Sequence, residues 1–131
     1  MTDLLMPSEL ELQVLSLLWE RGPLTVRQVQ ELLPDGKKRA YTTVLTVLQV
    51  MEKKRLVRHT RDGLAHVFAA AVAQRKVMGP MMRKLLQNVF GGRASAAVQC
   101  LVREGDVSAD ELKAMRQVIE AAVKDKQEGK E

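Results

Sequence analysis

The side chains of this sequence that could do chemistry are mostly cationic, and they are concentrated in one segment. Eight Lys and Arg residues lie between Lys37 and Arg61 with one acid, Glu52, so this segment has a net charge of +7, whereas the whole chain of 131 residues has +5. The remaining residues are therefore slightly acidic. A basic segment in such a protein is typical of a surface that binds a polyanion such as nucleic acid.

A helix predicted within this segment has side chains suited to contacting bases. The helix runs from about Tyr41 to Lys54, because four apolar residues follow the i, i+3, i+4, i+7 spacing of a buried face. On the opposite face, Thr side chains offer a hydroxyl for hydrogen bonds and a methyl for contact with thymine, which favours insertion into a DNA groove. The predicted core residues are Val44, Val47, Leu48 and Met51, and the predicted groove-facing residues are Thr42, Leu45, Thr46 and Gln49.

A β-hairpin is predicted directly after this helix. Two alternating stretches, 56–61 and 64–69, flank Asp62-Gly63, a dipeptide that favours a two-residue turn. Capping-box patterns at Ser8 and Thr25 predict two earlier helices. Three helices and a hairpin make a winged helix-turn-helix, with Arg58 and Arg61 of the wing placed to reach phosphates. The expected fold class is mainly α, with this wing and a helical C-terminal region.

The two histidines and the cysteine give weaker indications. A turn at Asp62-Gly63 pairs Arg61 with Leu64, Thr60 with Ala65 and His59 with His66, close enough for the two imidazoles to share a metal. Two ligands rarely suffice for a metal site, so we expect phosphate contact or wing packing, with no metal and no cofactor. Cys100 is the only cysteine and is expected to be a small buried residue on an alanine-rich helix.

Sequence patterns of the common enzyme classes are missing. The sequence has no G-x-S-x-G, H-E-x-x-H, P-loop or dinucleotide fingerprint, so we expect no enzyme. A protein-interaction module built on a winged helix is the alternative to a DNA-binding protein. No apolar run approaches the ~20 residues of a membrane span, and Asp3 argues against a signal peptide, so we expect a cytoplasmic protein without membrane insertion.

The C-terminal third is predicted to assemble two copies of the chain. Helices are expected over 72–90, over 94–102 and after Ser108, each with a wide apolar face that a twofold mate would bury. The expected domains are a winged helix at 1–71, a dimerisation domain at 72–126 and a disordered tail at 127–131, with fraying from Lys124. The expected dimer interface consists of Met78, Met81, Met82, Leu85, Leu86, Val89, Leu112, Met115, Ile119 and Val123.

Residues 7–33, 40–57 and 61–68 resemble the penicillinase-repressor family of bacterial winged-helix regulators, and the resemblance extends over essentially the whole chain. It implies a homodimeric repressor that binds an inverted-repeat operator of a beta-lactam-resistance or cell-wall-stress operon, with a membrane metalloprotease sensor that acts indirectly. It also places helix contacts to DNA at Thr42, Thr43, Leu45 and Thr46. The expected DNA-binding residues are Lys37, Lys38, Arg39, Tyr41, Thr42, Thr43, Leu45, Thr46, Gln49, Lys53, Arg58 and Arg61.

The sequence departs from the family pattern at several positions. Leu64 lies beside the wing tip, where a basic residue is common, and Arg55 lies where glycine is frequent after the Lys-Lys pair. A left-handed backbone at Arg55 would cost on the order of 1 kcal/mol. Cys100-Leu101 replaces the Asn-Phe bond that is cut in staphylococcal members, and the cysteine pair of copper-responsive members is absent. A stress-responsive regulator with another inducer and no proteolytic switch therefore stays an alternative.

Overall fold

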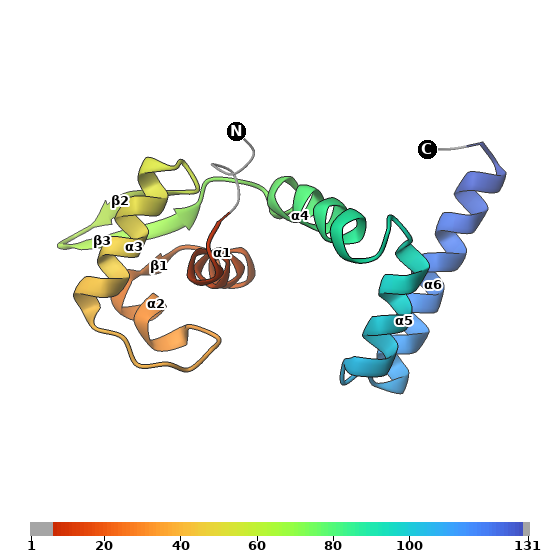
Figure 1. Cartoon of the computed structure of the whole chain (residues 1–131). Helices are drawn as coiled ribbons and strands as arrows, with labels where there is room; N and C mark the ends of the chain where they lie inside the picture. The colour runs from red at the N-terminus through yellow and green to blue at the C-terminus, as the bar shows by residue number, and fades with distance from the viewer. Residues whose placement is uncertain (1–6, 130–131) are drawn as a thin grey trace. The chain divides into compact units, whose positions relative to one another are not determined.

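The computed structural model describes residues 7–129, and the chain divides between residues 83 and 84 into two compact units. Figure 1 shows the elements in chain order. The first unit contains α1 (Glu9–Arg21), β1 (Leu24–Thr25), α2 (Val26–Leu32), α3 (Tyr41–Lys53), β2 (Val57–Asp62) and β3 (Ala65–Ala70). Helix α4 (Gln74–Val89) begins in the first unit and ends in the second, which also contains α5 (Ala94–Glu104) and α6 (Ala109–Gln127). The predicted fold class is confirmed.

Local sequence determines where the first two helices begin. The Ser8 hydroxyl accepts a hydrogen bond from the Glu11 N–H at 3.2 Å, and the Ser8 N–H donates to the Glu11 carboxylate at 2.9 Å. Thr25 and Gln28 make the same reciprocal pair at 3.2 and 2.9 Å. Both predicted capping boxes are therefore present, and each satisfies two backbone donors that a helix start leaves without an intrahelical partner.

One apolar core holds the first unit together. Val44, Leu48 and Met51 on α3 are at most 2% exposed, and Val47 packs against the same core. Phe68 of β3 is 1% exposed and belongs to this cluster, which also takes Val14 and Leu15 from α1. The predicted buried face of α3 is confirmed.

The hairpin differs from its predicted register. The strand order is β1-β3-β2, and β2 pairs His59 with Phe68, Arg61 with His66 and Asp62 with Ala65, so the loop residues are Gly63 and Leu64. Gly63 has a φ of +65°, and a turn with glycine as its first central residue matches the right-handed twist of the strands. The predicted pairing of His59 with His66 is wrong by two residues. Because side chains alternate along a strand with a period of two, this shift leaves both histidines on the predicted face of the hairpin.

Two further features of the first unit are a short additional strand and the way in which α3 ends. Strand β1 was not predicted; its two residues pair with Phe68 and Val67 of β3. After α3, Arg55 takes the left-handed conformation with a φ of +66°, so the backbone conformation considered for this position is present. The Arg55 N–H donates to the Glu52 carbonyl and the Leu56 N–H to the Met51 carbonyl, so α3 ends in a Schellman motif.

The boundaries near the C-terminal region lie elsewhere than expected. The compact units divide after residue 83, while the sequence places its boundary after residue 71. The Trp19 indole N–H donates to the Val72 carbonyl at 2.9 Å, and this bond ties the residues after β3 to the first unit. Helix α6 continues through the expected frayed residues to Gln127, with Lys124 and Lys126 in the last turn complementing the helix dipole. Of the expected tail, residues 130–131 lie outside the described residues.

A buried carboxylate links α1 to the end of α3. Glu11 is 5% exposed, and both of its oxygens accept hydrogen bonds from Lys54 Nζ, at 2.9 and 3.1 Å. Burial alone raises the pKa of Glu11, but the Ser8 N–H, the Lys54 ammonium and the Ser8 hydroxyl together lower the pKa below its ordinary value. The ionised form is therefore the one that the fold stabilises.

We predict that Glu11→Gln lowers the free energy of unfolding by about 1–2 kcal/mol at pH 7, because the amide keeps the capping box but not the ion pair. Because the folded-state pKa of Glu11 is depressed, its contribution is present above the unfolded pKa and lost as pH falls through the folded one. Denaturant unfolding at several pH values should therefore show the two proteins converge in acid. An equal difference at every pH would contradict this account.

We also predict that Arg55→Gly raises the free energy of unfolding by about 1 kcal/mol, because glycine adopts a left-handed backbone without steric cost. Arg55→Ala retains the Cβ and is the matched control, with little change expected. Thermal melts of the three proteins would measure the effect, and equal stabilities of the Gly and Ala variants would refute it.

Candidate nucleic-acid interface

Helix α3 presents a polar, exposed face to solvent. Tyr41, Thr42, Thr43, Thr46 and Gln49 are exposed, while Leu45 is half-buried because part of its side chain packs against the core. Since the opposite face packs into the core, these side chains are fixed in direction by the helix. Their donors and acceptors are therefore available to an external partner along about two turns of helix.

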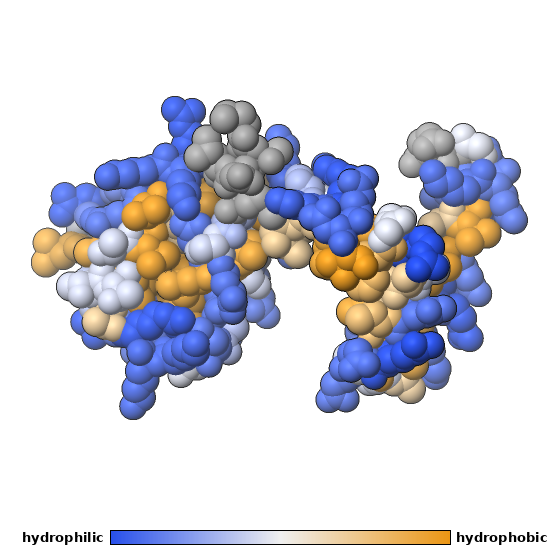
Figure 2. All heavy atoms as spheres, viewed as in Figure 1, coloured by the Kyte–Doolittle hydropathy of each residue, from blue (hydrophilic) through white to orange (hydrophobic). Residues whose placement is uncertain are grey.

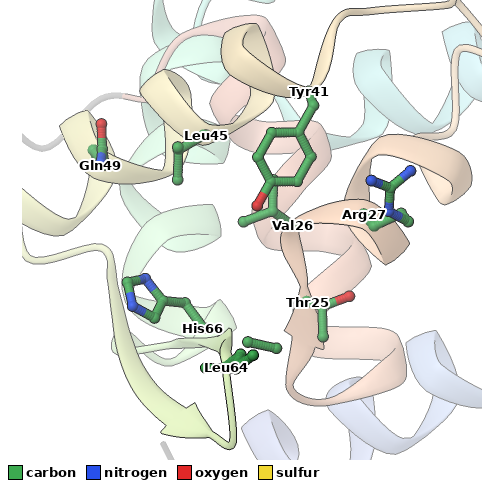
Figure 3. A pocket seen from close by; sticks show the side chains of 9 residues that line it. Thr25, Val26, Arg27, Tyr41, Leu45, Gln49, Leu64 and His66 are labelled. Carbon is green, nitrogen blue, oxygen red and sulfur yellow. The ribbon is translucent and has the colours of Figure 1, made fainter.

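A groove of about 570 Å³ lies between α3, the start of α2 and the wing tip. Figure 3 shows Tyr41, Leu45 and Gln49 along one side of it, with Leu64 and His66 of the wing opposite. The Arg27 guanidinium lies 5.7 Å from the centroid of the Tyr41 ring, a cation–π distance. The groove brings together three predicted DNA-binding residues and two wing residues that the sequence analysis considered, Leu64 and His66. The residues that it missed are Thr25, Val26, Arg27 and Ala65.

Arg27 was missed because it lies ten residues before the basic segment, on a different helix. Its position in the first turns of α2 is the signal that could have identified it, since the helix before a recognition helix crosses the DNA backbone in helix-turn-helix proteins. Arg27 also lines a second hollow of about 550 Å³, together with Lys37, Lys38 and Arg39.

The loop before α3 is held by Asp35. Its carboxylate accepts two hydrogen bonds from the Arg39 guanidinium, at 3.0 and 2.8 Å, and one from the Lys37 N–H at 3.0 Å. The Arg39 guanidinium and then the Lys37 N–H hold the pKa of Asp35 well below its usual range, and the Asp35 carboxylate in turn raises the pKa of Arg39. Arg39 thus has a structural bond in this loop, while Lys37 and Lys38 are exposed.

The two arginines of the wing project from opposite faces of the hairpin. Val57, His59 and Arg61 alternate with Arg58 along β2, and Val57 is buried, so Arg61 lies on the face that turns toward the core. Arg58 lies on the other face, where its guanidinium donates to the Ala70 carbonyl at 3.3 Å. Lys53, at the end of α3, is exposed beside Gln49 and Glu52 around a further hollow.

The histidine pair of the wing is linked to α3. The imidazoles of His59 and His66 stack with their centroids 4.8 Å apart. His59 Nδ1 lies 2.8 and 2.7 Å from the two Glu52 carboxylate oxygens. Among residues 7–129, no group of three or more His, Cys, Asp or Glu side chains is arranged to hold a metal ion.

The C-terminal helices expose the apolar residues that the sequence analysis assigned to a dimer interface. Helices α5 and α6 have no buried residue, and Val77 is the buried residue of α4. The expectation that Cys100 is buried is wrong, because its side chain is exposed, whereas Ala96 and Ala97 of the same helix are half-buried. Figure 2 shows hydrophobic residues on the surface of these helices. Exposed members of the predicted set are Met78, Met82, Leu85, Val89, Leu112, Ile119 and Val123; Met81, Leu86 and Met115 are half-buried.

Sequence reasoning did not include Leu101, Val102 and Val118 in this set, although they are 43–70% exposed. Leu101 and Val102 lie on α5 and Val118 on α6, so they add to the exposed apolar side chains of these two helices. Within the described part of the chain, no helix has the length and apolarity that crossing a membrane requires.

Known proteins match this chain over most of its length. Residues 7–121 match the family described as penicillinase repressor. The chain is also 42% identical over 113 residues to "Transcriptional regulator BlaI" of Mycobacterium tuberculosis strain CDC 1551 / Oshkosh, a match that covers 85% of this chain and 80% of that protein. The protein of the same name in strain ATCC 25618 / H37Rv matches to the same extent. This chain, whose motifs pointed to such a regulator, belongs to the penicillinase repressor family of transcriptional repressors.

Proposed function

We propose that this protein is a homodimeric repressor that binds an inverted-repeat operator in duplex DNA. The observation that carries the proposal is the exposed Thr-rich face of α3, which lies beside a groove and between basic side chains. A helix of this kind enters the major groove, where Thr42, Thr43 and Thr46 would contact base edges and Leu45 a thymine methyl. Its partner is therefore double-stranded DNA.

Phosphate contacts are proposed on both sides of α3. Lys37 and Lys38 precede the helix, Lys53 ends it, and Arg61 follows it on the wing face that carries His59. Tyr41 and Gln49 line the groove and are further proposed contacts. We retain Arg39 and Arg58 as candidates, with smaller effects expected, because each already makes a bond within the protein.

The dimer is proposed from the exposed apolar faces of the C-terminal helices. Leu85 is 43% exposed and Ile119 48%, although each lies within a row of apolar residues on its helix. A second copy related by a twofold axis would cover these rows, and two winged helices would then match two half-sites of an inverted repeat. One winged helix alone buries too little DNA surface for tight specific binding.

The family supports a proposal for the regulated genes. We propose a beta-lactam-resistance or cell-wall-stress operon, in keeping with the name of the penicillinase repressor family, and a cytoplasmic location. A membrane metalloprotease sensor would act on the protein indirectly. Cys100 and Leu101 lie within helix α5, so direct cleavage at this bond would require local unfolding of the helix.

The proposal predicts different defects for wing and helix variants. Arg61→Ala should weaken binding to every duplex about equally and lower the salt slope by roughly one, since one phosphate contact is lost. Thr46→Ala should lose about 1–3 kcal/mol of discrimination at particular operator positions while binding to random duplex persists. Gel shifts across a salt series, on an operator selected from a random pool, would measure both. Variants that match the parent on both DNAs would rule out this surface, and binding to a protein partner instead would favour an interaction module.

The dimer is tested in the full-length chain. Leu85→Glu with Ile119→Glu should raise the dissociation constant of the dimer by at least about a hundredfold, because each change buries an unpaired charge worth several kcal/mol. Gln117→Glu adds the same charge to an exposed polar position of α6 and is the matched control. Sedimentation would follow the assembly and gel shifts the operator affinity. A doubly substituted protein that stays dimeric would place the interface elsewhere.

A further inference from the structure

We propose that Glu52 is a positioning residue for DNA binding, whose carboxylate clamps His59 and so holds the wing beside the exposed face of α3. This inference rests on the proposed function. Glu52 is in the last turn of α3 and His59 is in the middle of β2. Without such a link, a two-stranded hairpin is only marginally ordered in water beyond the part that packs on the core.

One carboxylate binds both the backbone and the ring of His59. The His59 N–H donates to Glu52 Oε2 at 3.2 Å, and Nδ1 lies 2.7 and 2.8 Å from the two oxygens. On its other sides the His59 ring stacks on His66 at 4.8 Å and meets Phe68 at 5.4 Å. The ring is thus held between the end of α3 and β3, which leaves it little freedom to rotate.

The clamp determines where Arg61 lies. His59 and Arg61 are two residues apart on β2, so their side chains leave the same face of the hairpin. Arg61 is beyond the last core contact of β2, since every residue from Arg58 to Asp62 is exposed. A fixed His59 therefore restrains the part of β2 that carries Arg61. Less conformational entropy of Arg61 is then lost when it binds a phosphate.

Because Glu52 is negatively charged, a clamp and a simple charge effect predict opposite changes in DNA affinity when its carboxylate is removed. Glu52 is the one acid between Lys37 and Arg61, and it lies around a hollow with Gln49 and Lys53, two proposed DNA contacts. If only charge mattered, removing this carboxylate would strengthen binding to DNA at every salt concentration. If the clamp matters, removing the acceptor oxygens weakens binding although a negative charge has been lost.

Two substitutions of Glu52 separate charge from clamping. Glu52→Gln loses the charge but keeps an acceptor oxygen for His59, and we expect operator binding as tight as the parent's or tighter. Glu52→Ala loses both, and we expect about tenfold weaker binding with a salt slope lower by roughly one, because Arg61 no longer keeps its phosphate contact. Asp62→Asn removes a charge from the wing tip, where Asp62 pairs with Ala65 through its backbone but its side chain has no hydrogen bond or ion pair among the described residues, and it should behave like Glu52→Gln.

A double-substitution cycle assigns the effect to Arg61. Arg61→Ala should weaken binding in the parent and have little further effect in the Glu52→Ala background, whereas independent roles would give additive losses. His59→Phe retains the stacked ring but not the Nδ1 contact, so it should lose part of the DNA affinity that Glu52→Ala loses. If Glu52→Ala fails to fold, His59→Phe replaces it as the test. Thermal melts of each full-length variant would exclude loss of folding as the cause.

The outcomes distinguish a failure of this inference from a failure of the proposed function. If the parent chain shows no salt-dependent binding to duplex DNA, the proposed function fails and the clamp has no binding to support. If the parent binds but Glu52→Ala binds as tightly as Glu52→Gln, the inference alone is overturned. Additive losses in the cycle with Arg61→Ala would overturn it as well, because Glu52 would then act by a route that does not include the wing.

Discussion

Burial of one face of α3 is the constraint on which the proposed interface depends. Val44, Leu48 and Met51 are almost fully inaccessible, and each contributes about 1.5–3 kcal/mol by leaving water. A rotation of the helix by one residue would expose part of this row and bury Thr46, whose hydroxyl would lose its bonds to water. The direction of the exposed threonines is therefore determined by packing on the opposite side of the helix.

The wing depends on the same core through β3. This strand is central in the order β1-β3-β2, so Phe68 is flanked by a strand on each side, while β2 lies at the edge. An edge strand leaves unpaired backbone groups that favour association with other chains, and charged side chains such as Arg58 and Arg61 oppose this. The same arginines can thus serve solubility and phosphate binding, which is why their number alone does not identify a DNA surface.

The parts of the fold that depend on neighbouring residues in the sequence could be predicted, and those that depend on distant residues could not. The capping boxes at Ser8 and Thr25 and the apolar row of α3 involve spacings of three or four residues, and they are present. Strand β1 has two residues and is defined only by its pairing with β3, more than forty residues later. The register of the hairpin depended on which residue of Asp62-Gly63 begins the turn, and the backbone freedom of Gly63 decided it.

The candidate site shows the same division between local and distant information. Sequence identified the exposed face of α3 and left Lys54 and Arg55 out of the expected contacts, but the charge count gave every cation between Lys37 and Arg61 the same weight. In the folded chain Lys54 is paired with Glu11 and Arg39 with Asp35, and each of these acids lies outside the segment. Glu52, which counted against DNA binding by its charge, is paired with His59. Such pairings are tertiary contacts, so a charge count along the chain cannot reveal them.

These ion pairs determine which cations of the basic segment remain available to an external partner. Once Lys54 and Arg39 are set aside, the remaining cations fall into two groups. Lys37 and Lys38 precede α3, and the second group, from the last residue of α3 onward, is Lys53, Arg55, Arg58 and Arg61. A helix in a major groove has a phosphate strand on each side, so two separated groups match that target better than one continuous patch would. The structural ion pairs therefore reduce the number of available charges while leaving cations both before α3 and from its end to the wing, where the phosphate contacts are proposed.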